Sequence, residues 1–187
     1  KVIFSDTIVL ISLDTFLGSK NKIYNGIPNY IKSDMDKNRF GSILVDKIAS
    51  SIIKSPSSRF FLDRIIYKGK ILLLKDFVIP LSSDEIKIGY SNEQLNWAKQ
   101  NEEYIWKYFI ENELLFKTDD DLIDRFIIPA PFSKFYLEID NESPGKIGQW
   151  IGWQILRSFR KKNPTLKISE ILKLSYEEIF KEANYKP

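Results

Sequence analysis

Acidic side chains are the main candidates for chemistry in this sequence, because its 187 residues include neither histidine nor cysteine. That absence excludes serine–histidine and cysteine–histidine nucleophiles, and zinc sites built on imidazole or thiolate ligands. The acidic groups at positions 102–103, 111, 113 and 119–121 could bind a hard cation or act as general acid and base. None has the alternating ligands and glycine of a calcium loop, so we expect solvent-exposed faces, with residues 119–121 opening a helix.

A glycine-lined helix is the second unusual feature. Ser143 and Pro144 carry a helix-start signal, and Gly145, Gly148 and Gly152 follow at a spacing that places them on one helix face. An interior glycine costs about 0.5–1 kcal/mol relative to alanine, so this face needs a compensating close approach. Tight packing of one helix on another is the preferred interpretation. The alternative is a bare face that borders a groove for a peptide or partner segment.

The same helix carries Trp150 and Trp153, and Arg157 follows Trp153 one turn later. Tryptophan is most often a core residue, and that is the interpretation we favour here. The alternative is an exposed platform on which Arg157 lies over an indole ring. Arg157 also opens a basic run that ends at Lys162, which would complement the dipole at the helix C-terminus.

The elements that must position these side chains are mostly helical. The apolar spacing predicts a short helical segment after Pro28 and helices over about 43–53, 58–78, 91–114, 143–162 and 175–183. The helix over 58–78 is apolar on most sides and should form the buried centre. Residues 2–13 predict two short strands about a turn at Ser5-Asp6, and residues 134–139 could form another strand. The fold class is therefore α+β, mostly α-helical, with a short N-terminal edge strand or hairpin.

Size and charge narrow the function further. The length favours a single domain over residues 1–187, and we expect that its N-terminal part precedes Lys1. The chain has 28 Lys+Arg against 25 Asp+Glu, and the signs alternate along it. A nucleic-acid-binding surface needs clustered cations, so we expect no nucleic-acid partner. No apolar run approaches the roughly 20 residues that span a bilayer.

A family resemblance covers essentially the whole chain. Seven segments carry it, namely residues 12–18 (SLDTFLG), 26–30 (GIPNY), 67–70 (YKGK), 87–90 (KIGY), 101–111 (NEEYIWKYFIE), 129–132 (PAPF) and 142–154 (ESPGKIGQWIGWQ). In this order they resemble the gliding motility lipoprotein GldB family of gliding Bacteroidetes. The resemblance implies a lipid-anchored, periplasm-facing component of gliding motility and type IX secretion. Its partners would be other proteins of that machinery, and its anchor would lie outside this span.

GldB-like sequences are in turn similar to predicted zinc peptidases, which have His-Glu-x-x-His on one helix and Glu-Gly on the next. Here the helix over 43–53 supplies neither histidine nor glutamate, and Lys68-Gly69 stands where Glu-Gly would provide a ligand. A lysine at that position would repel a metal ion. The resemblance therefore implies a zincin-like scaffold with no catalytic residue, no metal site and no cofactor.

Two functional hypotheses follow. The first is a binding or structural module whose cleft lies between the N-terminal strand, the Tyr67/Lys68 helix and the glycine-lined helix, and accepts an extended peptide by strand addition. Its candidate partner- or peptide-binding residues are Asp14, Tyr67, Lys68, Trp150, Trp153 and Arg157. The second is a carboxylate-dependent or magnesium-type hydrolase, which requires two acids roughly 5–10 Å apart in one pocket.

Overall fold

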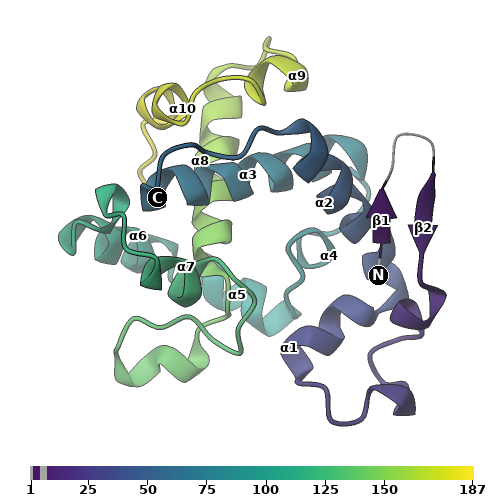
Figure 1. Ribbon diagram of the computed structural model, residues 1–187. Coiled ribbons are helices and arrows are strands. Elements are labelled where there is room, and N and C mark those ends of the chain that lie inside the picture. Colours follow the sequence, from purple (N-terminus) through teal and green to yellow (C-terminus); the bar gives the residue numbers. More distant parts are fainter. Residues whose placement is uncertain (1, 5–7) are drawn as a thin grey trace.

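The computed structural model describes residues 2–4 and 8–187. These residues form a mostly helical protein with one small antiparallel sheet at its edge (Figure 1). At this level the α+β prediction is confirmed.

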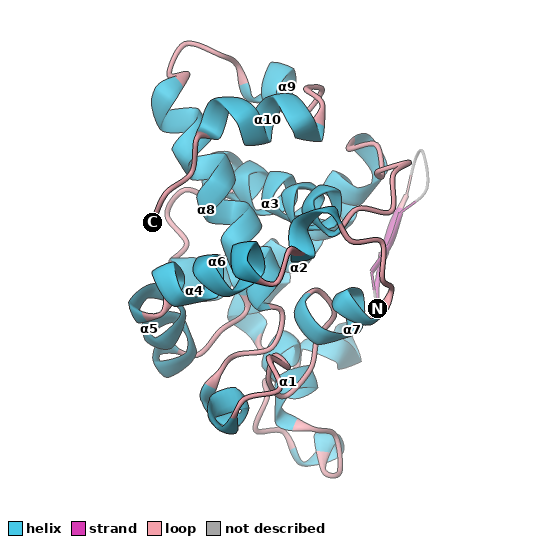
Figure 2. Cartoon of the chain, turned by 90° about the vertical axis from the view of Figure 1, so that its left-hand side faces the viewer, coloured by secondary structure: helices cyan, strands magenta, loops and turns pink. Residues whose placement is uncertain are grey.

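The sheet is a hairpin of β1 (Val2–Phe4) and β2 (Val9–Ile11). Val2 pairs with Ile11 and Ile3 with Leu10, which confirms two short strands in the expected segment. The predicted turn at Ser5-Asp6 lies outside the described residues. The hairpin lies at the periphery in both views (Figures 1 and 2), while the helices surround the core.

Ten helices occupy most of the described chain. They are α1 (Asn29–Lys32), α2 (Phe40–Ile52), α3 (Phe61–Val78), α4 (Asp84–Ile88), α5 (Asn92–Gln100), α6 (Glu102–Glu111), α7 (Asp121–Phe126), α8 (Ile147–Lys162), α9 (Ile168–Ile171) and α10 (Tyr176–Ala183). Six short 3₁₀ turns connect them, at Leu13–Phe16, Lys22–Tyr24, Ser33–Met35, Lys37–Arg39, Leu114–Phe116 and Glu138–Glu142.

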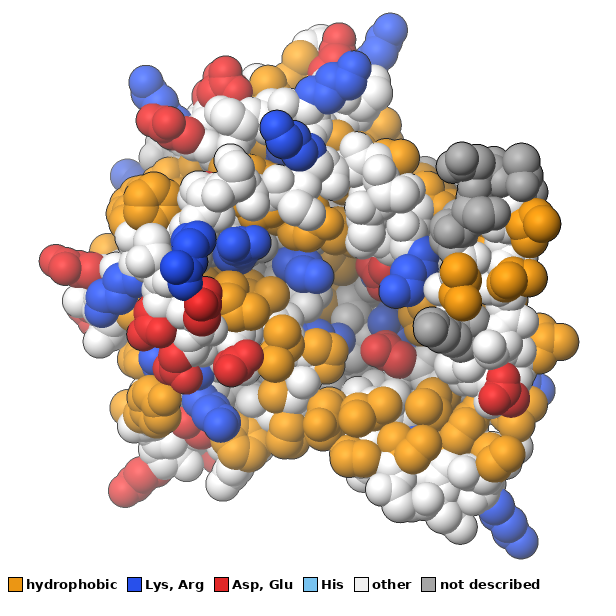
Figure 3. All heavy atoms as spheres, viewed as in Figure 1, with side chains coloured by type: hydrophobic (Ala, Val, Ile, Leu, Met, Phe, Trp, Pro, Cys, Tyr) orange, Lys and Arg blue, Asp and Glu red, His pale blue; other side chains and the backbone are white. Residues whose placement is uncertain are grey.

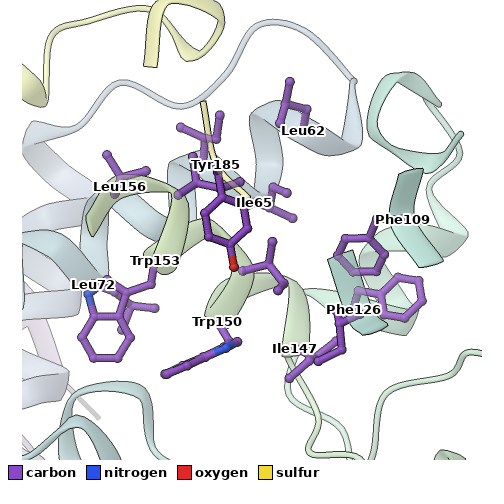
Figure 4. Packing of buried hydrophobic residues seen from close by; sticks show 14 of the residues in the cluster. Leu62, Ile65, Leu72, Phe109, Phe126, Ile147, Trp150, Trp153, Leu156 and Tyr185 are labelled. Carbon is purple, nitrogen blue, oxygen red and sulfur yellow. The ribbon is translucent and has the colours of Figure 1, made fainter. Parts of the chain in front are cut away.

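The core forms around α3, as its apolar sequence predicts. Ile65 and Ile66 are completely buried, and α8 crosses α3 with Trp153 and Leu156 also inside the core (Figure 4). A smaller apolar cluster joins α2 to the other side of α3. Helix α10 covers one end of α8, and α9 lies beside α10 (Figure 2).

Glycines set the distance between α3 and α8. A Cβ atom added to Gly152 would lie 1.9 Å from the carbonyl oxygen of Ile65, and one added to Gly69 would lie 2.3 Å from the carbonyl oxygen of Gly152. A methyl group fits at neither position, so the two backbones touch directly. Tight helix packing, the preferred interpretation of the glycine spacing, is therefore confirmed, and the alternative of a bare face beside a groove is wrong.

Helix starts and ends depend on local polar side chains. Ser91 and Ser175 each form a capping box at the N-termini of α5 and α10. The single helix predicted over about 91–114 is instead divided into α5 and α6 at Asn101, and α6 ends at Glu111. The backbone N–H and the side-chain amide of Asn101 both donate to the carbonyl oxygen of Trp97, at 3.0 and 2.9 Å. Asparagine competes with the helical pattern in this way, and the sequence spacing alone does not reveal it.

The segment before α8 differs from expectation. Helix α8 begins at Ile147, not at Ser143, whose hydroxyl instead donates to Asp140 and accepts from the backbone N–H of Ser133. The predicted strand over 134–139 is also wrong. The carboxylate of Asp140 accepts hydrogen bonds from successive backbone N–H groups at positions 135–137, which holds this stretch as a loop before the 3₁₀ turn at Glu138–Glu142.

Candidate functional site

Two hollows meet on one face of the molecule. The large groove has a volume of about 940 Å³ and lies between α1, the following 3₁₀ turns, α4 and the start of α5. The small pocket, of about 270 Å³, lies between α2, α3, the end of α4 and the start of α8. Arg39 lines both. On the face seen in Figure 3 the surface is hollowed beside the hairpin, and side chains of both charges meet there above a band of hydrophobic side chains.

Positive charge dominates the small pocket. Its lining includes five cationic side chains, Arg39, Lys47, Lys68, Lys75 and Lys146, against two carboxylates, Asp34 and Asp46. The positive N-terminal end of α8, a helix that extends from Ile147 to Lys162, points to the same region because Lys146 is its N-cap residue. The pocket therefore has a surplus of three positive charges before any ligand enters.

Three of these cations converge on the end of α4. The ammonium group of Lys75 donates to the carbonyl oxygen of Lys87 at 2.7 Å, and that of Lys146 donates to the next carbonyl oxygen, of Ile88, at 3.0 Å. Arg39 donates to the hydroxyl of Ser42, which donates in turn to the Lys87 carbonyl oxygen. One buried turn of backbone thus gathers cations from three separate elements.

Backbone geometry fixes two of these side chains. Lys146 has a φ of 63°, in the left-handed region that non-glycine residues rarely occupy. Gly89, with φ 81°, lies so close to Arg39 that a Cβ atom there would come within 2.4 Å of the guanidinium. Strained or glycine-dependent backbone at a pocket costs stability, and such features gather at functional sites.

Burial changes the protonation of the pocket lysines. Burial lowers the pKa of Lys75 to about 8, although the adjacent carboxylate of Asp46 acts in the opposite direction. Burial also lowers the pKa of Lys146, and the nearby charges of Arg39 and Lys68 contribute to that lowering. These cations are therefore close enough to repel one another, and an anion in the pocket would relieve that repulsion.

The two carboxylates of the small pocket are both held by ion pairs. Asp46 lies 2.7 Å from the ammonium of Lys75, and Asp34 lies 2.9 Å from the guanidinium of Arg39. Both carboxylates are therefore already paired with cations of the protein itself. Across the described part of the chain, moreover, no group of three or more histidine, cysteine, aspartate or glutamate side chains is placed to hold a metal ion.

Of the residues expected to bind a partner, the pocket contains only Lys68. Tyr67 is half-buried beside the small core cluster on α2 and α3. Asp14 is exposed in the 3₁₀ turn after the hairpin, where its backbone carbonyl accepts a hydrogen bond from Tyr24. Asp14 lines neither hollow, and neither do the described residues of the hairpin. The small pocket therefore includes the Tyr67/Lys68 helix and the start of the glycine-lined helix, which were expected to border the cleft, but not the hairpin.

The other three expected residues stabilise the fold. Trp150 is 2% exposed and Trp153 is fully buried, so the core interpretation is confirmed and neither indole offers its face to a partner (Figure 4). Arg157 does lie over the Trp153 ring, 3.7 Å from its centre. Its guanidinium, however, is held by two carboxylates, of Asp76 and Asp84, at 3.0 and 2.8 Å. This arrangement joins α3, α4 and α8.

One acidic position behaves differently from the solvent-exposed face predicted for it. Glu102 is half-buried and accepts hydrogen bonds from the Trp150 indole at 3.0 Å and from the Tyr185 hydroxyl at 2.7 Å. Burial raises the pKa of Glu102, while those two hydrogen bonds act in the opposite direction. The carboxylate thereby attaches the C-terminal segment to α8. Residues 119–121 are exposed and open α7, as predicted.

Sequence reasoning missed Arg39, Lys75 and Lys146, which form most of the pocket's charge. One signal was present, since Lys70 and Lys75 interrupt an apolar helix that is otherwise suited to a core. The two lysines behave differently, however. Lys70 donates to the carbonyl oxygens of Leu172 and Leu174 outside the pocket, whereas Lys75 enters it.

The fold and the site define a predominantly helical protein with a glycine-packed core and a cationic surface pocket. Compared with protein families, the chain matches the family described as gliding motility protein GldB over residues 1–187, and it belongs to that family. Neither the curated proteins nor the solved structures yield a match. Within the described residues, every helix is too short or too polar to cross a membrane.

Proposed function

We propose that this chain is a non-catalytic binding module of the gliding machinery. Family membership supports the role in gliding motility, and the family's lipoprotein designation supports attachment to a cell-envelope membrane. We further propose that a lipid anchor outside this span holds the domain facing the periplasm. Its partners would be other gliding proteins, including those that connect gliding to type IX secretion.

The charge of the small pocket is the observation that carries this proposal. A peptidase or magnesium-dependent hydrolase needs neutral or anionic ligands around its metal ion. Here the corresponding hollow presents Lys68, Lys75 and Lys146. Such a lining repels a divalent cation and favours recognition of a negatively charged group.

A degenerate metallopeptidase scaffold would account for this arrangement. Helices α2 and α3 pack side by side, as the zinc-ligand helix and its successor would. Asp46 is the only acidic residue on α2, and it is paired with the buried ammonium of Lys75. Lys68-Gly69 occupies α3 where the peptidases have Glu-Gly, and Gly69 is committed to the contact with α8. Loss of the ligands would leave a cleft whose remaining task is binding.

The large groove is the proposed contact surface for an extended segment of the partner. Arg39 lines both the groove and the small pocket, so a segment in the groove would bring a negatively charged group near the pocket's cations. The lining of the large groove includes the apolar side chains of Pro28, Ile86 and Pro131, and Ile128, which is 43% exposed, lines the small pocket. Apolar borders with a charged end are a common recognition pattern.

Site-specific photo-cross-linking in gliding cells tests this function. A photoreactive residue placed at Tyr30, which lines the large groove, or at Ile128 should yield adducts with gliding proteins. The matched control is Tyr104 on α6, which is 72% exposed and lines neither hollow. Adducts from Tyr104 but from neither cleft position would refute the groove as the contact surface.

The alternative function is a carboxylate-dependent or magnesium-type hydrolase. Metal analysis of the purified protein discriminates the two, because a hydrolase of this kind would retain a stoichiometric metal ion. Our proposal predicts no such ion at the pocket and no effect of chelators on thermal stability. Bound metal that Asp46→Asn removes would overturn the proposal.

A further inference from the structure

The cations of the small pocket have more hydrogen-bond donors than the protein uses. An ammonium group has three N–H donors. Lys146 uses one of them, on the Ile88 carbonyl oxygen, and Lys75 uses two, on the Lys87 carbonyl oxygen and the Asp46 carboxylate. Lys68 makes no hydrogen bond or ion pair to any described residue. Its ammonium group lies over the Tyr67 ring, 5.8 Å from the ring centre. Unused N–H donors thus remain on three ammonium groups that line the same pocket.

Three cations of the pocket, Lys75, Lys146 and Arg39, are held in position by the protein before a ligand arrives. Lys75 is 2% exposed and bound on two sides, and Lys146 projects from a left-handed turn whose neighbour, Gly145, lies against the carbonyl group of Ala130. Arg39 is held by Asp34 and Ser42. Preorganised donors lose little conformational entropy on binding, so this cluster has the physical character of a receptor for an anion.

Charge and size select the anion. The lining has a surplus of three positive charges, so a monoanionic carboxylate would leave most of it uncompensated. A phosphate monoester carries about −1.5 to −2 charges near neutral pH and offers three strong acceptor oxygens. The volume of about 270 Å³ accommodates such a group and the first atoms of the molecule that carries it. Lysines bind phosphate as point charges, which suits a pocket whose lining has four lysines and a single arginine.

We propose that the small pocket is a phosphate-binding site, which takes the terminal phosphate of a monoester through Lys68, Lys75 and Lys146. The assignment goes beyond the proposed role in gliding and does not depend on it. The phosphate can be presented by a lipid headgroup at the membrane or by a soluble ester, and both sources offer the same chemistry to the pocket. Bound phosphate would also satisfy the spare donors and reduce the mutual repulsion of the lysines.

Calorimetric titration of the purified chain with inorganic phosphate tests the site, with chloride at equal ionic strength as the reference. Lys68→Gln is the main variant, because Lys68 holds no other element in place and its loss leaves the fold intact. We expect a rise of about tenfold in the phosphate Kd, since one charged hydrogen-bond donor is removed. Lys117→Gln makes the same change of charge at an exposed position outside both hollows and should leave the Kd unchanged.

A second variant, at another lysine of the pocket, tests whether weaker binding comes from the lost charge and not from a rearrangement around position 68. Lys146→Asn removes the ammonium but keeps a residue type that tolerates a positive φ, and it should weaken phosphate binding to a similar extent. Thermal unfolding in chloride establishes that both variants are folded. A wild-type chain that binds phosphate no better than chloride overturns the proposal, as do two folded variants with wild-type Kd values.

Vesicle sedimentation then identifies the source of the phosphate. The probes are phosphatidylcholine vesicles with and without phosphatidic acid, whose headgroup is a phosphate monoester. Sedimentation that requires phosphatidic acid and is lost in Lys68→Gln supports a lipid source. Binding of inorganic phosphate without sedimentation supports a soluble ester. Sedimentation that Lys68→Gln and Lys117→Gln weaken equally would indicate general charge attraction and would count against the pocket.

Discussion

Replacing Gly152 by alanine tests the central packing of the fold. The added methyl carbon would lie 1.9 Å from the Ile65 carbonyl oxygen, and contacts shorter than 3.0 Å are essentially never seen. The two helices must therefore separate by at least 1.1 Å at this point. A radial gap of about 0.5–1 Å already forfeits a quarter to a half of the dispersion energy of each contact. The closely packed interface between α3 and α8 makes local relief of the clash impossible.

The expected net loss is about 2–2.5 kcal/mol in the free energy of unfolding. Overpacking of a tight core costs typically 1–3 kcal/mol, and a clash with backbone on both helices belongs at the upper end. Alanine returns about 0.5–1 kcal/mol through its higher helix propensity, which only partly offsets the strain. For a chain of this length the melting temperature should fall by roughly 4–10 °C.

Urea unfolding followed by tryptophan fluorescence measures the loss, because Trp150 and Trp153 are buried beside the contact. Gly41→Ala on α2 is the matched control, since a Cβ atom there meets nothing within 4 Å. That control should gain about 0.5–1 kcal/mol from helix propensity alone. Gly152→Ala with stability equal to or above wild type would refute the packing argument, provided that Gly41→Ala behaves as expected.

Three further changes test individual polar contacts. Asp76→Asn should cost about 2 kcal/mol, because Asp76 joins α3 to α4 and α8 through charged hydrogen bonds, and exposed Asp119→Asn serves as its control in urea unfolding. Between pH 8 and pH 9.5 the wild type should gain about 1.5 kcal/mol relative to Lys75→Met, measured by urea unfolding across pH, because the pKa of Lys75 is about 8 in the folded state against 10.5 for an unperturbed lysine. Tyr185→Phe should cost about 1 kcal/mol and expose the C-terminal segment to limited proteolysis, because it removes the hydrogen bond to Glu102.

The direction of the pH effect follows from proton binding. The unfolded chain keeps a proton on Lys75 up to about pH 10.5, whereas the folded chain releases it near pH 8. Between these values the unfolded state binds more protons, so stability rises with pH, and below pH 8 both states are charged and the penalty is constant. A stability difference that stays flat from pH 8 to pH 9.5 would contradict the burial of this ammonium. Equal losses in Asp76→Asn and Asp119→Asn would likewise contradict the α3–α4–α8 contact.

Features of the fold that depend on one segment were predictable from the sequence. The burial of α3 follows from apolar residues on most of its sides, and the capping boxes at Ser91 and Ser175 follow from local spacing. The glycines of α8 predicted a close contact but not its partner, because Gly69 on α3 carries no comparable signal. The start of α8 was misplaced because Ser143 satisfies a different part of the chain, the backbone at Ser133.

The pocket was not predictable in the same way. Its cations come from the 3₁₀ turn at Lys37–Arg39, from α2 and α3, and from the N-cap of α8, and each is unremarkable in its own segment. Their convergence depends on two carbonyl groups at the end of α4, a helix that the apolar spacing did not indicate. Lys68 alone was identified, and only because the family resemblance directed attention to that position.

The glycine contact and the pocket share their two principal helices, so they should not be independent. Helix α3 presents Gly69 to α8 and Lys68 and Lys75 to the pocket, while α8 carries Gly152 in the contact and begins at Lys146. A separation of about 1 Å between the helices would move the lysines of α3 relative to Lys146.

Phosphate binding should therefore weaken in Gly152→Ala under conditions where that variant is still folded. In Gly41→Ala, which leaves the helix separation unchanged, the Kd should stay at the wild-type value. The comparison distinguishes a preorganised pocket from a loose cluster of charges, because a flexible cluster would adjust to a shift of this size and lose no affinity. An unchanged phosphate Kd in folded Gly152→Ala would show that the core does not set the positions of the cations.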